Sequence, residues 1–269
     1  AGLVRVHADG RTALHDLETG AVRFTVQLEP RGAGSATAAV VHLPGLPRLL
    51  VVPEGDRRLT ALDLVSGDVR WRFTARRPSQ FRLRRAGKLL IVAAGDPTLV
   101  ALDVVTGDVV WRARGRVPFS GDVAVDPDAL FALAGGRGAP AELVHLDPWT
   151  GAIRWTTALE DRFVPGQEPL LTPSTVVVPA RDRRGSGAHG YERTTGVERW
   201  GHEPGLASPT TAWLAVDDAV VANSAAGALL CLEASTGEVR FHHVFSRHVD
   251  ADQPRRLEPV LRSGALFVP

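Results

Sequence analysis

A ten-residue pattern occurs six times along the 269 residues and constrains the fold more than any other feature of the sequence. It is an apolar residue, an acid, two variable residues, Ser or Thr, Gly, three variable residues and an aromatic; the first copy has one extra residue before its acid. The glycines are Gly20, Gly67, Gly107, Gly151, Gly196 and Gly237, and successive glycines lie 47, 40, 44, 45 and 41 residues apart. This fixed spacing indicates that the chain repeats one unit of supersecondary structure.

The other fixed positions are the acid and the aromatic. The acids are Asp16, Asp63, Asp103, Asp147, Glu192 and Glu233, and the aromatics are Phe24, Trp71, Trp111, Trp155, Trp200 and Phe241. The acid can accept hydrogen bonds from the turn that follows it, and the glycine supplies the positive φ of a tight hairpin. The aromatic faces the same way in every copy and can fill the wedge between neighbouring sheets. We expect Val69 and Trp71 to share one face of their strand.

Each copy after the first is preceded by two further strand-like runs. The runs nearest the pattern are rich in β-branched residues and leucine and are typical of buried strands: Leu49–Pro53, Leu89–Ala94, Ala129–Ala134, Thr175–Ala180 and Ala219–Ala222. Another strand precedes each of them, for example Arg82–Arg84 or Ala212–Val216. A period of 40–47 residues is that of one four-stranded propeller blade. The sequence therefore predicts an all-β fold, a β-propeller of antiparallel four-stranded blades, with six to seven blades visible in one domain, residues 1–269.

The two ends of the sequence do not complete a simple ring of blades. Gly2–Val6 is a buried-strand run without a strand before it, and Pro259–Arg262 and Ala265–Val268 supply a first and a second strand. Closing the ring would require only the first of these two. Our hypothesis is that another blade begins here, and that the residues belong to a longer parent protein with seven or eight blades.

Composition excludes several function classes. The 31 cationic and 30 acidic side chains give a net charge of +1, so there is no electrostatic case for nucleic acid or an anionic membrane as a partner. We find no apolar run of about 18 residues, so no membrane span is expected. Lys88 is the only lysine, which is typical of a bacterium with a GC-rich genome. Cys231 is the only cysteine, so no intrachain disulfide or thiolate metal cluster can form; this is compatible with the periplasm or the cytoplasm.

The spacing Ala-Leu-Asp-x-x-Thr-Gly-x-x-x-Trp resembles the repeat of the PQQ-like (quinoprotein-type) propeller superfamily. It is cleanest at Ala61–Trp71 and Ala101–Trp111, and the resemblance covers nearly the whole chain. That superfamily includes PQQ-dependent alcohol and glucose dehydrogenases and also the BamB-like outer-membrane assembly lipoproteins, which work as scaffolds without a cofactor. The resemblance implies that the aromatics join blades and do not bind quinone.

The resemblance to the non-enzymatic branch is the stronger one. A PQQ dehydrogenase needs an activating metal ion, a catalytic aspartate and a flat cofactor slot, and the alcohol dehydrogenases also carry a disulfide between adjacent cysteines. Here the aspartates belong to the repeat, and the loops between copies are mostly short. We expect a non-catalytic scaffold that binds a protein or peptide partner and holds no cofactor. The alternatives are a PQQ-dependent dehydrogenase-like quinoprotein and the sensor module of a larger signalling protein.

Several residues outside the repeat are candidate sites. Trp149 lies in a turn where most residue types would fit, so it is a candidate anchor for a partner; the alternative is local packing. His242, His243, His248, Asp250 and Asp252 form the densest run of candidate metal ligands, but adjacent strand residues point to opposite faces, and we expect no metal site. We interpret Arg181–Arg184 with Gly185–Gly187 as a solvated turn, and Cys231 as a small buried residue.

Overall fold

The computed structural model describes residues 2–7, 9–30, 39–41, 48–77, 79, 81–94, 96–136, 139–159, 168–182, 185–206, 210–224, 228–244, 260–262 and 265–267. Within these residues every regular element is a strand. The chain divides into two compact units, the first comprising Ala1–Ser120 and Asp147–Ala152, the second Gly121–Leu146 and Ile153–Pro269. In the described part of the chain, no helix is long and apolar enough to cross a bilayer.

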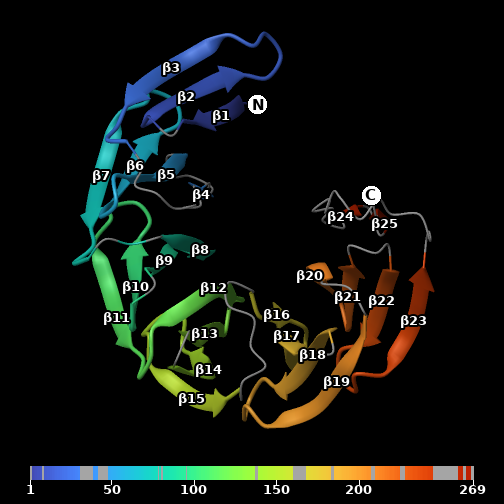
Figure 1. Ribbon diagram of the computed structural model, residues 1–269. Coiled ribbons are helices and arrows are strands. Elements are labelled where there is room, and N and C mark those ends of the chain that lie inside the picture. Colours follow the sequence, from blue (N-terminus) through green and yellow to red (C-terminus); the bar gives the residue numbers. More distant parts are fainter. Residues whose placement is uncertain are drawn as a thin grey trace. The chain divides into compact units, whose positions relative to one another are not determined.

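The first unit holds three antiparallel sheets whose strands follow one another in chain order (Figure 1). The three-stranded sheet is β1 (Gly2–Val6), β2 (Arg11–Asp16) and β3 (Val22–Gln27). One four-stranded sheet is β4 (Ala39–Val41), β5 (Leu49–Glu54), β6 (Arg58–Asp63) and β7 (Val69–Thr74). The next is β8 (Arg82–Ala86), β9 (Leu89–Ala93), β10 (Thr98–Asp103) and β11 (Val109–Arg114).

Three more four-stranded sheets follow in the same manner. The first is β12 (Phe119–Val125), β13 (Leu130–Gly136), β14 (Ala139–Leu146) and β15 (Ile153–Ala158). The second is β16 (Leu170–Leu171), β17 (Thr175–Asp182), β18 (Gly185–Glu192) and β19 (Glu198–Leu206). The third is β20 (Thr210–Val216), β21 (Ala219–Ser224), β22 (Ala228–Glu233) and β23 (Val239–Val244). A two-stranded sheet, β24 (Val260–Arg262) and β25 (Ala265–Phe267), completes the set. The prediction of an all-β chain of four-stranded antiparallel repeats is confirmed.

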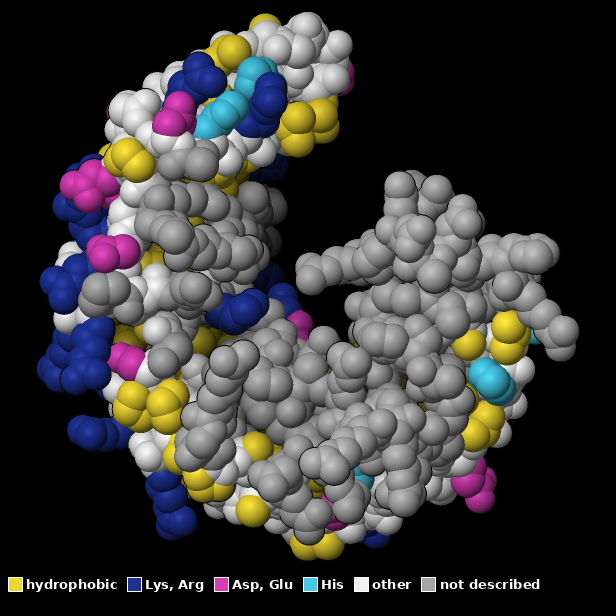
Figure 2. All heavy atoms as spheres, viewed as in Figure 1, with side chains coloured by type: hydrophobic (Ala, Val, Ile, Leu, Met, Phe, Trp, Pro, Cys, Tyr) yellow, Lys and Arg dark blue, Asp and Glu magenta, His cyan; other side chains and the backbone are white. Residues whose placement is uncertain are grey.

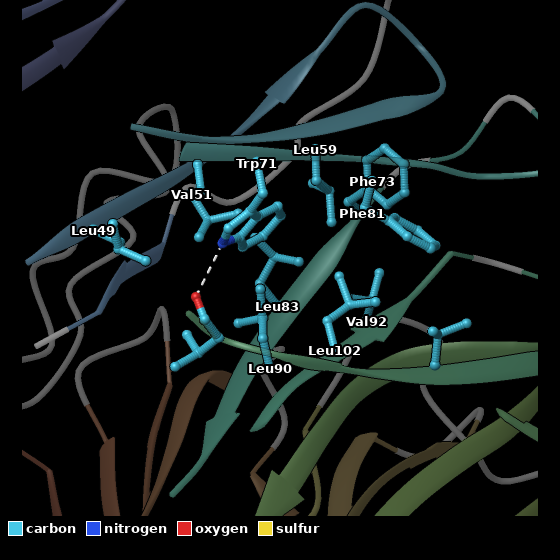
Figure 3. Close-up of a cluster of buried hydrophobic side chains, with 13 residues drawn as sticks. Leu49, Val51, Leu59, Trp71, Phe73, Phe81, Leu83, Leu90, Val92 and Leu102 are labelled. Carbon is cyan, nitrogen blue, oxygen red and sulfur yellow. Dashed lines mark hydrogen bonds between the residues drawn. The ribbon is translucent and has the colours of Figure 1, made fainter. Parts of the chain in front are cut away.

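Burial falls from the second strand to the fourth in the sheets of β4 to β7, β8 to β11 and β20 to β23. All described side chains of β5, β9 and β21 are buried, because these runs are continuously apolar or nearly so. The fourth strands β7 and β11 instead alternate, with Trp71 and Trp111 facing inward and arginines facing solvent. Figure 3 shows the core between the sheets of β7 and β8, where Phe73 and Phe81 lie beside Leu59.

A β-bulge in the fourth strand corrects one expectation. Trp71 pairs with Ala61, but the next pair joins Val69 to Leu62, so Arg70 is skipped. Val69 and Trp71 therefore lie on opposite faces, Val69 exposed and Trp71 buried, and the expectation that they share a face was wrong. The bulge recurs at the same place in all six repeats. Strict two-residue alternation failed here because a bulge inserts one residue into the period.

Candidate functional site

The turn between the third and fourth strands is built around the acid of the repeat. Asp63 Oδ1 accepts hydrogen bonds from the backbone N–H groups of Val65 at 2.7 Å and Ser66 at 3.3 Å. The N–H of Gly67 donates to the carbonyl of Asp63 at 2.8 Å, and the φ of Gly67 is 81°. Short side chains that bond their own turn favour this conformation over a continued strand. Asp103 and Asp147 hold their turns in the same way.

An arginine three residues after the glycine is the partner that the sequence analysis missed. Arg70 donates to Asp63 Oδ2 from Nε at 3.1 Å and from its terminal nitrogen at 2.6 Å. The equivalent arginines pair with the acid in three other copies: Arg23 with Asp16, Arg199 with Glu192 and Arg240 with Glu233. The signal was present in the sequence as an arginine seven residues after the acid. It was read as variable because the third copy has Val110 there.

These contacts favour the ionised acid. The hydrogen bonds from Arg70 and from the turn N–H groups lower the pKa of Asp63 although burial opposes ionisation. Arg23 likewise lowers the pKa of Asp16, and the hydrogen bonds from Thr195 and Arg199 lower that of Glu192. A carboxylate stabilised in this way and enclosed in its own turn is an anchor for the backbone.

Asp63→Asn is expected to lower the free energy of unfolding at pH 7 by about 2 kcal/mol, because the charge-assisted bonds from Arg70 are lost. Since the folded pKa is depressed, the carboxylate stabilises the fold above the unfolded pKa of about 3.9 and ceases to do so as the pH falls through the folded value. The difference from the unmodified protein should therefore shrink below about pH 4. Urea unfolding at several pH values measures it. Asp68→Asn, in the same turn but exposed, is the control; an equal loss there would contradict the assignment.

The aromatic of each of the first five copies contacts the turn of the next copy. Trp71 Nε1 donates to the carbonyl of Val104 at 3.0 Å, drawn as the dashed line in Figure 3. Trp111, Trp155 and Trp200 make the same bond, to the carbonyls of Pro148, Arg193 and Ala234. The ring also covers the glycine of that next turn: an added Cβ on Gly107 would lie 2.6 Å from Trp71 Cδ2.

The two phenylalanines of the series differ from each other. Phe24 covers Gly67, where an added Cβ would lie 2.8 Å from its ring. Phe241 is 46% exposed, and every side chain of its strand β23 is exposed. Gly20, the turn glycine of the first copy, is not covered by an aromatic ring, because a Cβ there would meet nothing within 4 Å. The remaining turn glycines, Gly151, Gly196 and Gly237, are covered by Trp111, Trp155 and Trp200.

Trp149 combines exposure with a local contact. Its side chain is 49% exposed, and its backbone N–H donates to Asp147 Oδ1 at 2.9 Å. The ring lies over Gly87 in the β8–β9 turn, where an added Cβ would be 2.9 Å from Trp149 Cη2. The residue therefore packs at one edge and presents the rest of its ring to solvent.

The other sequence candidates fall in separate places. His242 and His243 pair with Leu230 and Leu229 at successive positions of β23, while His248, Asp250 and Asp252 lie outside the described residues, as do Arg183 and Arg184. Among the side chains that the structure describes, no group of three or more His, Cys, Asp or Glu could hold a metal ion. Cys231 is buried, and burial raises the pKa of its thiol.

One buried carboxylate was not anticipated. Glu54, at the end of β5, is 5% exposed. Burial opposes its ionisation, but a hydrogen bond from Thr60 Oγ1 and another from Arg72 Nε at 3.1 Å hold its pKa below the usual value. Arg58 adds a second ion pair at 3.8 Å. The sequence offered no signal for it, since this acid is outside the repeated pattern.

Comparison with known proteins places these features in context. The profile of the family described as outer membrane protein assembly factor BamB matches residues 8–118 and 115–268. No curated protein sequence matches the chain. The solved structure of BamB from Moraxella catarrhalis is similar, with a TM-score of 0.71 and 19% identity over 99% of this chain and 76% of that chain.

Two other solved structures illustrate the range of similar proteins. Sqt1 from Saccharomyces cerevisiae has a TM-score of 0.67 and 14% identity over 98% of this chain and 76% of that chain. Quinohemoprotein alcohol dehydrogenase from Comamonas testosteroni has a TM-score of 0.58 and 15% identity over 80% of this chain and 43% of that chain. Identities this low establish the fold alone. The predicted β-propeller class is confirmed.

Proposed function

The chain belongs to the family described as outer membrane protein assembly factor BamB, and we propose from this premise that it is a non-catalytic scaffold that binds a protein partner. The observation that carries the proposal is that the carboxylates of the repeat are occupied within their own turns, as at Asp63 and Asp103. This structural role explains why the carboxylates recur in every copy without assigning them a catalytic role. Loops held on a rigid frame of strands are a common place for binding.

The aromatic series has a structural role in this proposal. Trp71, Trp111, Trp155 and Trp200 join each blade to the next through one hydrogen bond and a ring packed on glycine. Phe24 does so by packing alone. We propose that residues 1–269 form one propeller domain.

The family also bears on compartment and partner. Its description as an outer membrane assembly factor favours the bacterial periplasm over the cytoplasm and a partner protein of the cell envelope. The quinoprotein alternative is supported by fold likeness only, and this chain spans 43% of the dehydrogenase compared above.

Two measurements test the scaffold. Purified protein incubated with PQQ and calcium should give no alcohol- or sugar-dependent dye reduction, and such reduction would establish the dehydrogenase alternative instead. Cross-linking in envelope fractions of the source bacterium should capture one partner protein. The complex of the two proteins should keep a constant stoichiometry across its peak in size-exclusion chromatography. A chain that stays alone in every fraction contradicts the scaffold proposal.

Trp149→Ala should weaken that complex by at least about tenfold, because exposed tryptophans with a packed edge are frequent anchors of protein interfaces. Val65→Ala is the matched control, because Val65 holds the equivalent turn position in the second copy and is 82% exposed. Titration of the isolated complex partner against each variant measures the effect. Unchanged affinity of the Trp149 variant would leave the residue with local packing only.

A further inference from the structure

Charge is distributed unevenly along a chain that is almost neutral as a whole. Residues 54–116 carry 13 Arg and Lys and 7 Asp and Glu, a net charge of +6. The remaining residues carry 18 cationic and 23 acidic side chains, a net charge of −5. The stretch with excess positive charge comprises β6 to β11 of the first unit.

Much of the excess lies on and just after the fourth strands β7 and β11. Figure 2 shows Lys and Arg side chains gathered along the margin that these strands occupy. We call Arg76, Arg112, Arg114 and Arg116 the arginine surface; all four are exposed. Among the described residues none of the four has an ion pair with an acid, whereas Arg70 and Arg72 are paired with Asp63 and Glu54.

The repeat itself provides the comparison that separates structural from functional arginines. Arg112 directly follows Trp111, where four other copies have Thr25, Thr156, Gly201 and His242. The second copy has Arg72 there, which is paired with Glu54. Arg76 and Arg116 come five residues after the tryptophan, where the other copies have Glu29, Glu160, Gly205 and Ser246. A position that accepts threonine, glycine or glutamate in other blades has no structural need for arginine.

The local backbone places these arginines equivalently in two successive blades. The N–H of Ala75 donates to the carbonyl of Arg57 at 2.7 Å, and the N–H of Gly115 donates to that of Pro97 at 2.8 Å. Arg76 and Arg116 each follow directly on these bonded residues. The terminal nitrogen of Arg57 also donates to the carbonyl of Arg76 at 3.1 Å, which brings another cation to the same end of the sheet.

We propose that the arginine surface docks an acidic segment of a protein partner; this inference rests on the proposed scaffold function. Guanidinium groups match carboxylates with two parallel hydrogen bonds. Val69, Val109 and Val110, exposed by 38%, 39% and 50%, provide apolar contact on the same strands. Arginine is also enriched at protein–protein interfaces relative to the rest of the protein surface.

Two features disfavour a nucleic acid or a membrane as the occupant. Single-stranded nucleic acids stack bases on exposed aromatics, but the aromatics of β7 and β11 are buried, Trp71 and Trp111 at 7% and Phe73 at 8%. A long polyanion or a charged bilayer would also meet the net −5 of the rest of the chain. A short acidic segment would meet the arginine surface alone.

Fluorescence anisotropy with the unmodified chain and a labelled peptide of alternating Glu and Val tests the proposal. Binding should weaken as salt rises from about 0.05 to 0.2 M, because exposed ion pairs are screened. The triple variant Arg76→Gln/Arg112→Thr/Arg116→Gln should weaken it about tenfold. Arg5→Gln/Arg11→Gln/Arg48→Gln removes the same charge from exposed arginines elsewhere and should leave the affinity within about twofold.

Each result has a separate meaning. Absence of peptide binding, or an equal loss in both triple variants, overturns the arginine surface as a specific site. Tighter binding of labelled single-stranded DNA or of phosphatidylglycerol vesicles, lost in the first variant alone, overturns the acidic protein segment as its occupant. If the envelope complex forms and survives the first variant, the surface fails while the scaffold function stands. If the peptide binds as expected but no envelope partner is found, the scaffold function fails.

Discussion

Replacing Trp71 by alanine is expected to lower the free energy of unfolding by about 4 kcal/mol, because it removes a buried aromatic ring between two sheets. The change also removes the hydrogen bond from Nε1 and leaves the carbonyl of Val104 without this donor. It uncovers Gly107 as well, against which the ring packs. Urea unfolding followed by circular dichroism measures the loss.

Two substitutions divide this effect into its parts. Trp71→Phe keeps a ring, as the first copy does with Phe24, and should cost about 1 to 2 kcal/mol for the hydrogen bond and part of the packing. Phe241→Ala removes the aromatic of the sixth copy, which is 46% exposed, and should cost less than about 1 kcal/mol. Equal losses for Trp71→Ala and Phe241→Ala would show that docking on the next turn does not determine the stability of the blade.

Gly107→Ala is expected to cost at least about 3 kcal/mol, since two penalties coincide at this position. Its φ of 77° lies in the left-handed region, which disfavours any residue with a Cβ. The added Cβ would also lie 2.6 Å from Cδ2 of the Trp71 ring, which is only 7% exposed. Equilibrium unfolding in urea is the measurement.

Gly20→Ala separates the two penalties. Its φ is 71°, nearly the same, but a Cβ there meets nothing within 4 Å. Only the backbone term remains, and the expected cost is about 1 kcal/mol. The difference between the two variants therefore reports the contact between ring and turn. Equal costs would contradict the close packing of Trp71 on Gly107.

The repeat pattern predicted much of the fold for physical reasons that act over a few residues. The acid and glycine of each turn interact within the same short stretch, and buried strands are continuously apolar. The turns and the buried strands can therefore be predicted from a few neighbouring residues. The bulge at Arg70 was not predicted because its position depends on pairing with the neighbouring strand, and its effect is to reverse the face of Val69. Arg70 itself was visible as a repeated residue, but its partner became evident only with that backbone geometry.

The candidate sites divide in the same way. Trp149 was identified because its turn does not require a tryptophan, and its contact with Gly87 was beyond prediction since it joins segments distant in sequence. In the sequence, the arginines on and just after β7 and β11 are part of a nearly neutral composition and do not stand out. The structure shows that they occupy exposed positions on successive sheets.

The sequence by itself determined the length of the repeat unit, through the spacing of its copies. It also determined the turn and the residues that build it, because these depend on contacts within one hairpin. The tertiary structure decided which residues of that unit are used between sheets and which remain accessible. Trp71 and Phe241 hold the same position in the pattern, yet one is buried on a glycine turn and the other is half-exposed. Whether this aromatic side chain is buried depends on the neighbouring blade, so the pattern within one repeat does not predict it.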